Sequence, residues 1–562
     1  MLTTRQPEPL HRQLEGGAVH CRLAGDQSFR YLPESLIYEK VTKDNIEANL
    51  RLPWWPWISS LLSPSDSITN RIHDQAKKVF AILTLIGQEH TISDLIYKDN
   101  LTDKDLPLAL QSDNKSLLVP KEPREGDTAK AFSSFAFWDE RRVRDFLEKQ
   151  WLVLAPILDD IGKELNLDPE CPLPFKKIEL KVRAQGVFVH KATLHPAHQR
   201  WSVEAIPGQS VAIKEIHDED VYDREKENLK QIQDLGHPHL IKLLTACQRG
   251  SFRCLIFPWA EGGNLWEFWE REDQAPRTID FVQWQLDQVF GLIDAIRVLH
   301  DKNIRHGDIK PQNILHFIDL SADGKASGRG ILVLADVGVS KMHKHATLKR
   351  NEATGTVEVT LLYEAPEAEY DRRNNQPRSR RYDMWSAGCM LLEFVVWLLY
   401  DFGAVKTFRS RRISSKDDPT TAPGNFFRQK KGQVKIHSMV KKAMELLRKD
   451  PRCAEGTALA ELLDMIENRL LQVNPEDRAK ASELHDKLQE IVSKSREDPS
   501  YLWKGTSMPV ETPKFFVRSK SRQNSDSSAA SSGSFGSSSS GSSGRMQSTR
   551  GSTDSVGSIG SS

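Results

Sequence analysis

The sequence has little cysteine for its length: six residues in 562, none of them spaced as a C-x-x-C pair. This scatter argues against a disulfide framework or a zinc site and is typical of a reducing compartment. A charge of one sign is also lacking, because 78 Lys and Arg residues are balanced by 77 Asp and Glu residues. No global field therefore favours nucleic acid, an anionic membrane or an acidic substrate.

Long uninterrupted apolar runs are absent as well. The polar N-terminal stretch contains no apolar signal core. The longest apolar stretch, residues 390–405, contains Glu393 and Asp401 and predicts a buried helix rather than a membrane span. We therefore expect no membrane and no nucleic-acid partner, and a cytoplasmic location. A short basic run at residues 518–522 leaves a nuclear location as the alternative.

Changes in composition divide the chain into several parts, as its length suggests. Residues 1–30 lack periodicity and are expected to be flexible, whereas residues 31–167 have helical spacing and predict an N-terminal domain whose partner is unknown. A Pro-rich linker at 168–177 precedes strand-like and then helical segments over 178–495. Residues 506–562 are rich in Ser and Gly and predict a disordered tail.

The predicted helical domain contains one clear apolar stripe. Its members recur at steps of three and four residues and end before Gly87, where a helix would stop: Ile68, Ile72, Ala76, Val79, Leu83 and Ile86. A polar stretch at 112–128 predicts a loop. The tryptophan-rich patch at 54–57 is either a docking surface or, more simply, packing material for helices.

A lysine within an apolar strand run is the first residue with chemical meaning. Lys214 ends the run at 211–214, where an ammonium is costly unless it meets an anion. Glu225, in the helical segment that follows, could pair with Lys214 and direct it at phosphates. Glu227 is the alternative, because the helix register is not fixed by the sequence. A plain strand-edge lysine is the simpler interpretation of Lys214 taken alone.

The most specific signal is the run at 306–315, His-Gly-Asp-Ile-Lys-Pro-Gln-Asn-Ile-Leu. Phosphoryl transfer needs positioned phosphates, a divalent metal and a carboxylate near the attacking hydroxyl. Asp308 would accept or orient the hydroxyl proton, Lys310 would neutralise charge on the phosphoryl group, and Asn313 would hold Mg²⁺. Further on, an apolar run ends at Asp336, which can chelate Mg²⁺ before a sharp turn at Gly338.

These segments, followed by Ala-Pro-Glu at 365–367, resemble the signature set of eukaryotic-type Ser/Thr protein kinases. The resemblance implies an α+β, bilobal fold with a small β-rich N-lobe (178–260) and a helical C-lobe (261–495). It implies ATP and Mg²⁺ as cofactors, protein substrates, and transfer of the γ-phosphoryl group to Ser or Thr. The whole arrangement, with its N-terminal helical region, also resembles kinases of filamentous fungi.

The same resemblance assigns residues that would bind the nucleotide. Phe257 would be the gatekeeper of the adenine pocket. The carbonyl of Pro258 and the N–H of Ala260 would face adenine, and Pro258 lacks only a donor that the site does not use. Asn264 is a candidate for the ribose contact, and Gly186 belongs to the loop that would cover the phosphates.

Further residues would support the site without touching ATP. By resemblance, Thr360 bonds the catalytic Asp and Lys, Asp383 braces the catalytic loop, and Arg478 pairs with the carboxylate of Glu367. Lys310 is the residue that Ser/Thr kinases carry in this loop, which favours Ser/Thr over Tyr specificity. The Ala-Pro-Glu and Arg478 elements belong to a platform for protein substrates and argue against a small-molecule kinase.

Two departures from the family pattern bear on function. The phosphate-covering loop should read G-x-G-x-x-G, but residues 181–192 offer only Gly186, so a raised KM for ATP is expected before any loss of kcat. Gly307 stands where many kinases have an Arg that meets a phosphorylated loop, so activation by loop phosphorylation is not expected. The eroded loop also motivates the alternative of a pseudokinase scaffold that only binds proteins.

Overall fold

The computed structural model describes most of the chain up to Arg518. The described residues are 8–22, 28–50, 67–112, 117–122, 130–159, 162–184, 186–201, 210–318, 328–337, 361–368, 371, 374, 378–414, 424–430, 433–502 and 511–518. The tryptophan-rich patch at 54–57, Gly338 and Thr360 lie outside this set.

The first part of the chain is a small domain of short helices. It contains α1 (Leu10–Gly16), α2 (Glu34–Lys40), α3 (Lys43–Leu50), α5 (Ile68–Gln75), α6 (Lys77–Leu85), α7 (Ile92–Tyr97) and α8 (Glu140–Lys149), with two hairpins, β1 (Val19–Arg22) with β2 (Ser28–Tyr31) and β3 (Leu108–Leu110) with β4 (Leu118–Pro120). The predicted apolar stripe lies along two helices rather than one, and it is buried except at its ends, Ile68 and Ile86, which are partly buried. Ala76 interrupts them with a non-helical φ of −139°, and Gly87 follows α6 at φ 66°.

Two predictions for this part of the chain are wrong. Residues 1–30 are not a flexible stretch throughout, because Leu10 and Leu14 of α1 are buried in the core of the helical domain. The polar stretch at 112–128 is not entirely a loop, since Leu118–Pro120 forms β4 and Leu118 is buried. Local polarity hides both features, because each rests on a few apolar side chains that contact residues distant in sequence.

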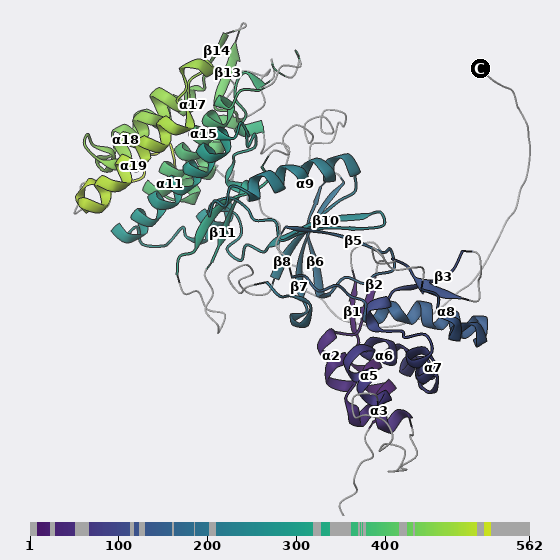
Figure 1. Cartoon of the computed structure of the whole chain (residues 1–562). Coiled ribbons are helices and arrows are strands. Elements are labelled where there is room, and N and C mark those ends of the chain that lie inside the picture. Colours follow the sequence, from purple (N-terminus) through teal and green to yellow (C-terminus); the bar gives the residue numbers. More distant parts are fainter. Residues whose placement is uncertain are drawn as a thin grey trace, which may run out of the picture. The chain divides into compact units, whose positions relative to one another are not determined.

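A six-stranded sheet follows (Figure 1). Its order is β5 (Lys163–Leu167), β9 (Thr245–Arg249), β10 (Phe252–Pro258), β8 (Ser210–Ile216), β7 (Val187–Leu194) and β6 (Phe175–Ala184). All neighbours are antiparallel except β5 and β9, which are parallel. Helix α9 (Glu219–Gln233) begins at Asp218, whose side chain accepts the Val221 N–H, and packs on this sheet.

The sheet moves two predicted boundaries. Lys163–Leu167 was expected in the helical domain, but it forms the edge strand β5 and pairs with β9. The predicted linker at 168–177 is shortened, because β6 already begins at Phe175. Phe175 is fully buried with Cys21 and Phe29 of the β1–β2 hairpin, so the first hairpin completes the apolar cover of one sheet face.

The remainder of the described chain is mainly helical. Its elements are α10 (Leu265–Arg271), α11 (Ile279–Asp301), β11 (Ile314–Phe317), β12 (Ile331–Leu334), α15 (Arg381–Leu399), α16 (Phe402–Ile413), β13 (Phe427–Lys430), β14 (Gln433–Ile436), α17 (Ser438–Arg448), α18 (Ala458–Met465) and α19 (Ala481–Glu497). They surround one large apolar core, of which Trp269, Trp385 and Trp397 are fully buried members.

Helix α15 accounts for the longest apolar stretch of the sequence. It is the one helix in the described part of the chain that is long and apolar enough to cross a membrane, and its most apolar window is entirely buried in the protein. The predicted buried helix at 390–405 is therefore present in part. It ends at Leu399, and Asp401 caps the next helix by accepting the Ala404 N–H.

The predicted start of the disordered tail at residue 506 is also wrong for part of the tail. Residues 511–518 contact the helical region, where Phe516 is 1% exposed and its ring lies 5.1 Å from that of Tyr400. Arg411 on α16 holds this segment by donating to the Phe515 carbonyl at 2.5 Å. Phe515 and Phe516 supply the apolar surface for this contact. The overall composition of the tail does not reveal them, because the residues around them are polar.

Candidate active site

Lys214 lies at the centre of the site, on the inner strand β8. Its Nζ donates to Glu225 Oε1 at 2.6 Å and to Asp336 Oδ1 at 2.9 Å. Glu225 is buried on the face of α9 that also carries Tyr222 and Leu229, whereas Glu227 is exposed and contacts Gln231. The structure therefore places Glu225, not Glu227, against the lysine.

Burial and charge oppose each other in this trio. Burial alone would lower the pKa of the Lys214 ammonium, but the carboxylates of Asp336 and Glu225 outweigh it and raise the pKa above its usual value. Burial raises the pKa of the Glu225 carboxyl, and the Lys214 ammonium opposes that rise. At neutral pH the lysine is held charged between two acidic groups, so it is positioned to meet a further anion.

The predicted catalytic loop folds around Asp308. Lys310 Nζ donates to Asp308 Oδ2 at 2.8 Å, and Asn313 Nδ2 donates to the Asp308 carbonyl at 2.8 Å and to Oδ2 at 2.9 Å. Lys310 and Asn313 are buried, while the Asp308 side chain remains 23% exposed. Three residues that sequence analysis selected by their order thus form one hydrogen-bonded unit with a partly accessible carboxylate.

Asp383, at the start of α15, holds this loop in place through hydrogen bonds. Its carboxylate accepts the backbone N–H groups of His306 at 2.8 Å and Gly307 at 2.7 Å, and it contacts His300 Nε2 at 2.8 Å. Burial would raise the pKa of Asp383, but the contact with His300 and the backbone donors lower it. Sequence analysis missed His300, because a lone histidine near the end of an amphipathic helix carries no distinguishing pattern.

Asp336 follows β12 and is one of three described non-glycine residues with positive φ, at 60°. Such a conformation costs most side chains about 1 kcal/mol or more, and aspartate is one of the few that adopt it. His306 contacts the adjacent Ala335 carbonyl through Nε2 at 2.9 Å, and the Ala335 N–H donates to the Asn313 carbonyl at 2.9 Å. These contacts fix the Asp336 segment directly beside the catalytic loop.

The predicted adenine-binding residues lie where β10 leaves the sheet. On the neighbouring strand β8, Phe257 pairs with Ala212 and Pro258 pairs with Val211. These two partners precede Lys214 by two and three residues. Ala260, two residues after Pro258, is buried. Asn264 instead caps α10, because its side chain accepts the Glu267 N–H at 3.1 Å. The ribose role predicted for Asn264 therefore competes with a capping contact.

Gly186 occupies the turn between β6 and β7 with φ 72°, a conformation that favours glycine. Its carbonyl accepts the His217 N–H at 3.0 Å, which ties the turn to the end of β8. A Cβ at Gly186 would meet no atom within 4 Å, so this glycine is explained by backbone conformation and not by crowding.

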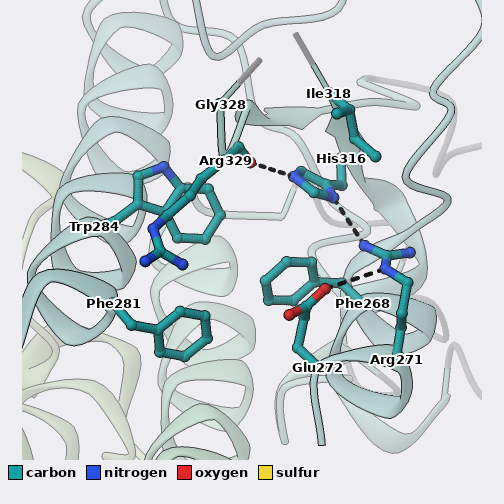
Figure 2. A pocket seen from close by; sticks show the side chains of 9 residues that line it. All are labelled: Phe268, Arg271, Glu272, Phe281, Trp284, His316, Ile318, Gly328 and Arg329. Carbon is teal, nitrogen blue, oxygen red and sulfur yellow. Dashed lines mark hydrogen bonds and ion pairs between the residues drawn. The ribbon is translucent and has the colours of Figure 1, made fainter. Parts of the chain in front are cut away.

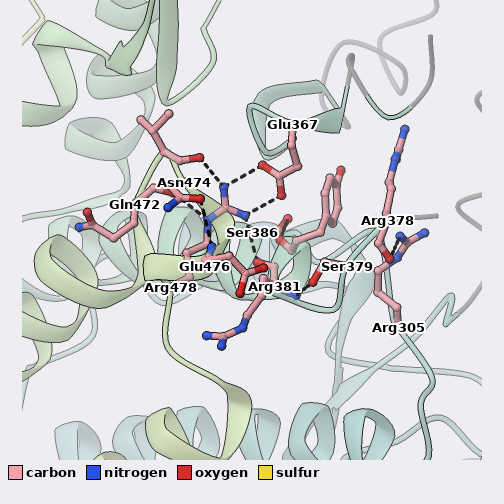
Figure 3. Close-up of polar contacts among 12 residues, drawn as sticks. Arg305, Glu367, Arg378, Ser379, Arg381, Ser386, Gln472, Asn474, Glu476 and Arg478 are labelled. Carbon is pink, nitrogen blue, oxygen red and sulfur yellow. Dashed lines mark hydrogen bonds and ion pairs between the residues drawn. The ribbon is translucent and has the colours of Figure 1, made fainter. Parts of the chain in front are cut away.

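The predicted pair of Glu367 and Arg478 is bidentate (Figure 3). Arg478 Nη1 and Nη2 donate to Glu367 Oε1 and Oε2 at 2.6 and 2.7 Å, and Nε donates to the Gln472 carbonyl at 2.7 Å. The Arg478 side chain is fully buried. Nearby, Ser386 on α15 donates to the Tyr363 carbonyl at 2.9 Å, so the 363–367 segment is anchored both to α15 and to the segment that precedes α19.

A separate pocket of about 210 Å³ lies between α10, α11 and the β11–β12 pair (Figure 2). Aromatic and charged side chains line it together, and His316 contacts the Arg329 carbonyl at 2.7 Å and the Arg271 guanidinium at 3.0 Å. None of the predicted site residues lines it, so it is distinct from the cluster around Lys214 and Asp308.

The fold, together with the cluster around Lys214 and Asp308, is that of a phosphotransferase domain. Comparison with known proteins agrees. A model of the protein kinase domain matches residues 202–488, and the chain belongs to the protein kinase family. The matched part begins after β7, so the glycine-poor turn at Gly186 lies outside it.

Several relatives carry Ser/Thr kinase names. Mitogen-activated protein kinase kinase kinase 13-A of Xenopus laevis is 27% identical over 44% of this chain and 23% of its own length. Serine/threonine-protein kinase nekl-2 of Caenorhabditis elegans is 29% identical over 33% of this chain and 50% of its own. Serine/threonine-protein kinase 36 of Mus musculus is 31% identical over 34% and 13%. The chain spans half or less of the length of these relatives.

Proposed function

We propose that the chain is a protein kinase that transfers the γ-phosphoryl group of ATP to Ser or Thr hydroxyls of protein substrates in the presence of Mg²⁺. The observation that carries this proposal is that Lys214 contacts both Glu225, at 2.6 Å, and Asp336, at 2.9 Å, although Asp336 lies 122 residues further along the chain. The resemblance to Ser/Thr kinases and the names of the relatives support the choice of substrate.

Each residue would have one task in the reaction. The Lys214 ammonium, braced by Glu225, would hold the α- and β-phosphates, and the backbone at Pro258 and Ala260 would hold adenine between the two lobes. The Asp308 carboxylate, oriented by Asn313 and partly accessible, would accept the proton of the attacking hydroxyl. Lys310, bonded to the same carboxylate, would balance the negative charge that develops on the transferred group.

The side chains present fit a magnesium ion. Asp336 supplies a carboxylate that is 49% exposed, and Asn313 uses its amide nitrogen for Asp308, which turns its oxygen to other ligands. Mg²⁺ prefers such oxygen donors and usually takes one or two from the protein and the rest from phosphates and water. Asp336 and Asn313 would hold the ion, whose positive charge would offset the negative charge of the phosphates.

The glycine-poor turn bears on how ATP is covered. Gly186 alone supplies the bare backbone that close contact with phosphates requires. Because the residues proposed for phosphate binding, metal binding and proton transfer are all present in the sequence, we expect weak ATP binding with a measurable kcat. We also expect the protein to act in the cytoplasm.

Phosphate incorporation from labelled ATP into the protein itself and into a Ser/Thr peptide library tests the proposal. Asp308→Asn retains the shape of the side chain and removes the base, so its activity should fall by at least about a hundredfold. Equal incorporation by the wild type and Asp308→Asn contradicts the proposal. Incorporation on tyrosine would contradict the Ser/Thr assignment alone.

The eroded phosphate loop favours a second candidate, a pseudokinase that uses the fold only to bind proteins. Thermal unfolding with ATP, with and without Mg²⁺, separates the two. A ligand at 100 times its Kd stabilises the folded state by about 2.7 kcal/mol. No rise of the melting temperature at millimolar ATP and Mg²⁺, together with no phosphate transfer, favours the scaffold.

A further inference from the structure

Strand β5 belongs to the sheet but lies outside the part of the chain that the kinase family model matches. The matched part begins at residue 202, whereas β5 spans Lys163–Leu167. It pairs in parallel with β9, with Glu164 in register with Ala246. Strands β6 and β7 also precede the matched part, but β5 comes before the predicted linker at 168–177, so the N-terminal part of the chain supplies this edge of the sheet.

Alternation along the strand places Glu164 on the face of the sheet that carries α9. Leu165 and Leu167 pack against the apolar cluster that contains Phe175, on one face. Ala246, the register partner of Glu164, belongs to the cluster on the other face, together with Tyr222 of α9. Because successive side chains of a strand point to opposite faces, Glu164 faces the helix.

Glu164 makes two ion pairs with that helix. Lys226 Nζ lies 2.6 Å from Glu164 Oε1, and Lys230 Nζ lies 3.3 Å from Oε2. Lys226 also contacts Asp223 at 3.1 Å within the helix. The hydrogen bond from Lys226 is the main cause that lowers the pKa of Glu164, so the carboxylate stays charged at neutral pH. One carboxylate of the sheet edge thus holds two successive turns of α9.

A second contact brings the start of β5 against the end of the same helix. Gly162 has φ 82°, and a Cβ there would lie 2.8 Å from the Gln233 side-chain nitrogen. The Gly162 N–H donates to the Leu244 carbonyl at 2.8 Å, which fixes the approach. Residues 162–164 therefore follow α9 from Lys226 to its last residue, Gln233.

Lys226 is adjacent in sequence to Glu225, the partner of Lys214. A rotation or shift of α9 would move Glu225, and Glu225 is the one carboxylate of the trio that reaches the lysine from the helix. We propose that Glu164 is a positioning residue: strand β5 holds α9 through Lys226 and Lys230 and thereby keeps Glu225 against Lys214 in the orientation that phosphate binding requires. This inference rests on the proposed kinase function.

The inference predicts a specific kinetic signature. Glu164→Gln keeps the shape and removes the charge, so α9 should loosen and Lys214 should hold the phosphates less well. We expect about a fivefold loss of kcat/KM for ATP with a rise of KM for ATP, and no change of KM for the peptide, because two partly exposed ion pairs are lost. A merely structural defect would lower the active fraction, and hence the apparent kcat, while leaving KM for ATP unchanged.

The matched control is Glu179→Gln. Glu179 also contacts two lysines, Lys177 and Lys181, but within β6 at the other edge of the sheet and without a helix partner. Its substitution should leave both constants within about twofold of the wild type. Hydrogen exchange of the amides in α9 should be faster in Glu164→Gln than in Glu179→Gln, and this readout does not depend on activity.

Exchange of the charges between Glu164 and its lysine partners tests the inference most directly. Glu164→Lys should be more impaired than Glu164→Gln, and adding Lys226→Glu and Lys230→Glu should restore at least part of the loss through the reversed pairs. Wild-type kinetics in Glu164→Gln, or a loss that the reversal does not relieve, overturns the inference. If the full-length wild type is no more active than Asp308→Asn, the proposed function fails instead. Hydrogen exchange of the amides in α9 then still tests whether Glu164 holds this helix.

Discussion

The backbone N–H of Gly307 donates to Asp383 Oδ1 at 2.7 Å while Gly307 itself adopts φ 79°. The backbone conformation at this position therefore explains why a glycine stands where many kinases have an arginine. A glycine reaches this conformation without the clash between Cβ and backbone that other residues meet. Among the described residues, Asp383 from α15 holds the loop in place through the backbone N–H groups of His306 and Gly307.

Substitution of Gly307 by Ala should therefore destabilise the loop by about 1 kcal/mol and reduce kcat through the neighbouring Asp308. Urea unfolding and phosphate transfer measure the two effects. Gly16→Ala is a suitable control, because that glycine ends α1 without a positive φ and with no atom within 4 Å of the added Cβ. Equal unfolding midpoints for Gly307→Ala and the wild type would show that the conformation imposes no strain.

The pair of Arg478 and Glu367 should be intolerant even of lysine. A lysine cannot make two parallel hydrogen bonds, and it would also lose the contact to the Gln472 carbonyl. Because the guanidinium is buried, Arg478→Lys should cost about 3 kcal/mol of unfolding free energy, and Glu367→Gln a similar amount. In a double-mutant cycle the two losses should add to clearly more than the loss of the double variant.

An additive cycle would contradict this interpretation of the pair. Arg448→Lys is the matched control, because Arg448 contacts Asp464 and Glu467 at 2.7 Å on an exposed helix surface. Its substitution should change the unfolding free energy by no more than about 0.5 kcal/mol, as is usual for exposed ion pairs.

Order along the chain made much of the candidate site predictable. Taken alone, Lys214 has a simpler interpretation, but one kind of chemistry explains it together with the residues that follow in order. The structure joins Lys214 to Asp336 and joins Asp308 to Lys310 and Asn313. The choice between Glu225 and Glu227 needed the helix register, which depends on which face of α9 packs on the sheet. Tertiary packing, and not local pattern, decides that register.

The sequence was uninformative where single residues act across long distances. His300 meets Asp383, and Glu164 meets Lys226, from segments whose local patterns are ordinary. The edge strand β5 was assigned to the helical domain, because five residues without a β-rich pattern give no strand signal by themselves. Pairing with β9 supplies the hydrogen bonds that make it a strand.

His198 should make the contact between α2 and the segment after β7 sensitive to acid. Its Nε2 accepts the Glu34 N–H at 3.0 Å, so its Nδ1 carries the proton that faces the Pro156 carbonyl, also at 3.0 Å. Burial lowers the pKa of His198 below its ordinary value of 6.5. The unfolded chain therefore takes up a proton at a higher pH than the folded protein, and stability must fall as the pH drops below about 6.5.

Urea unfolding at pH 7.5 and pH 5.5 checks this prediction. Between these values the wild type should lose about 1 kcal/mol more than His198→Ala, in which the titrating group is absent. His11→Ala, at an exposed position on α1, should show the same loss as the wild type. Equal pH dependence in all three proteins would mean that His198 is not the group that responds.

Phe516 should anchor the 511–518 segment to the helical region. Its ring is 1% exposed and lies 5.1 Å from the ring of Tyr400 and 6.3 Å from that of Phe408. Phe516→Ala should lower the unfolding free energy by about 2 to 4 kcal/mol, with the smaller value if the whole segment detaches rather than leaving a cavity. Val517→Ala removes an exposed side chain from the same segment and should change the unfolding free energy by less than about 0.5 kcal/mol.

Limited proteolysis distinguishes a detached segment from a cavity in the Phe516 variant. A detached segment is cleaved at 511–518 in the Phe516 variant, whereas the segment stays protected in the Val517 variant. If both variants unfold and are cleaved like the wild type, the segment contributes nothing to the stability of the kinase domain.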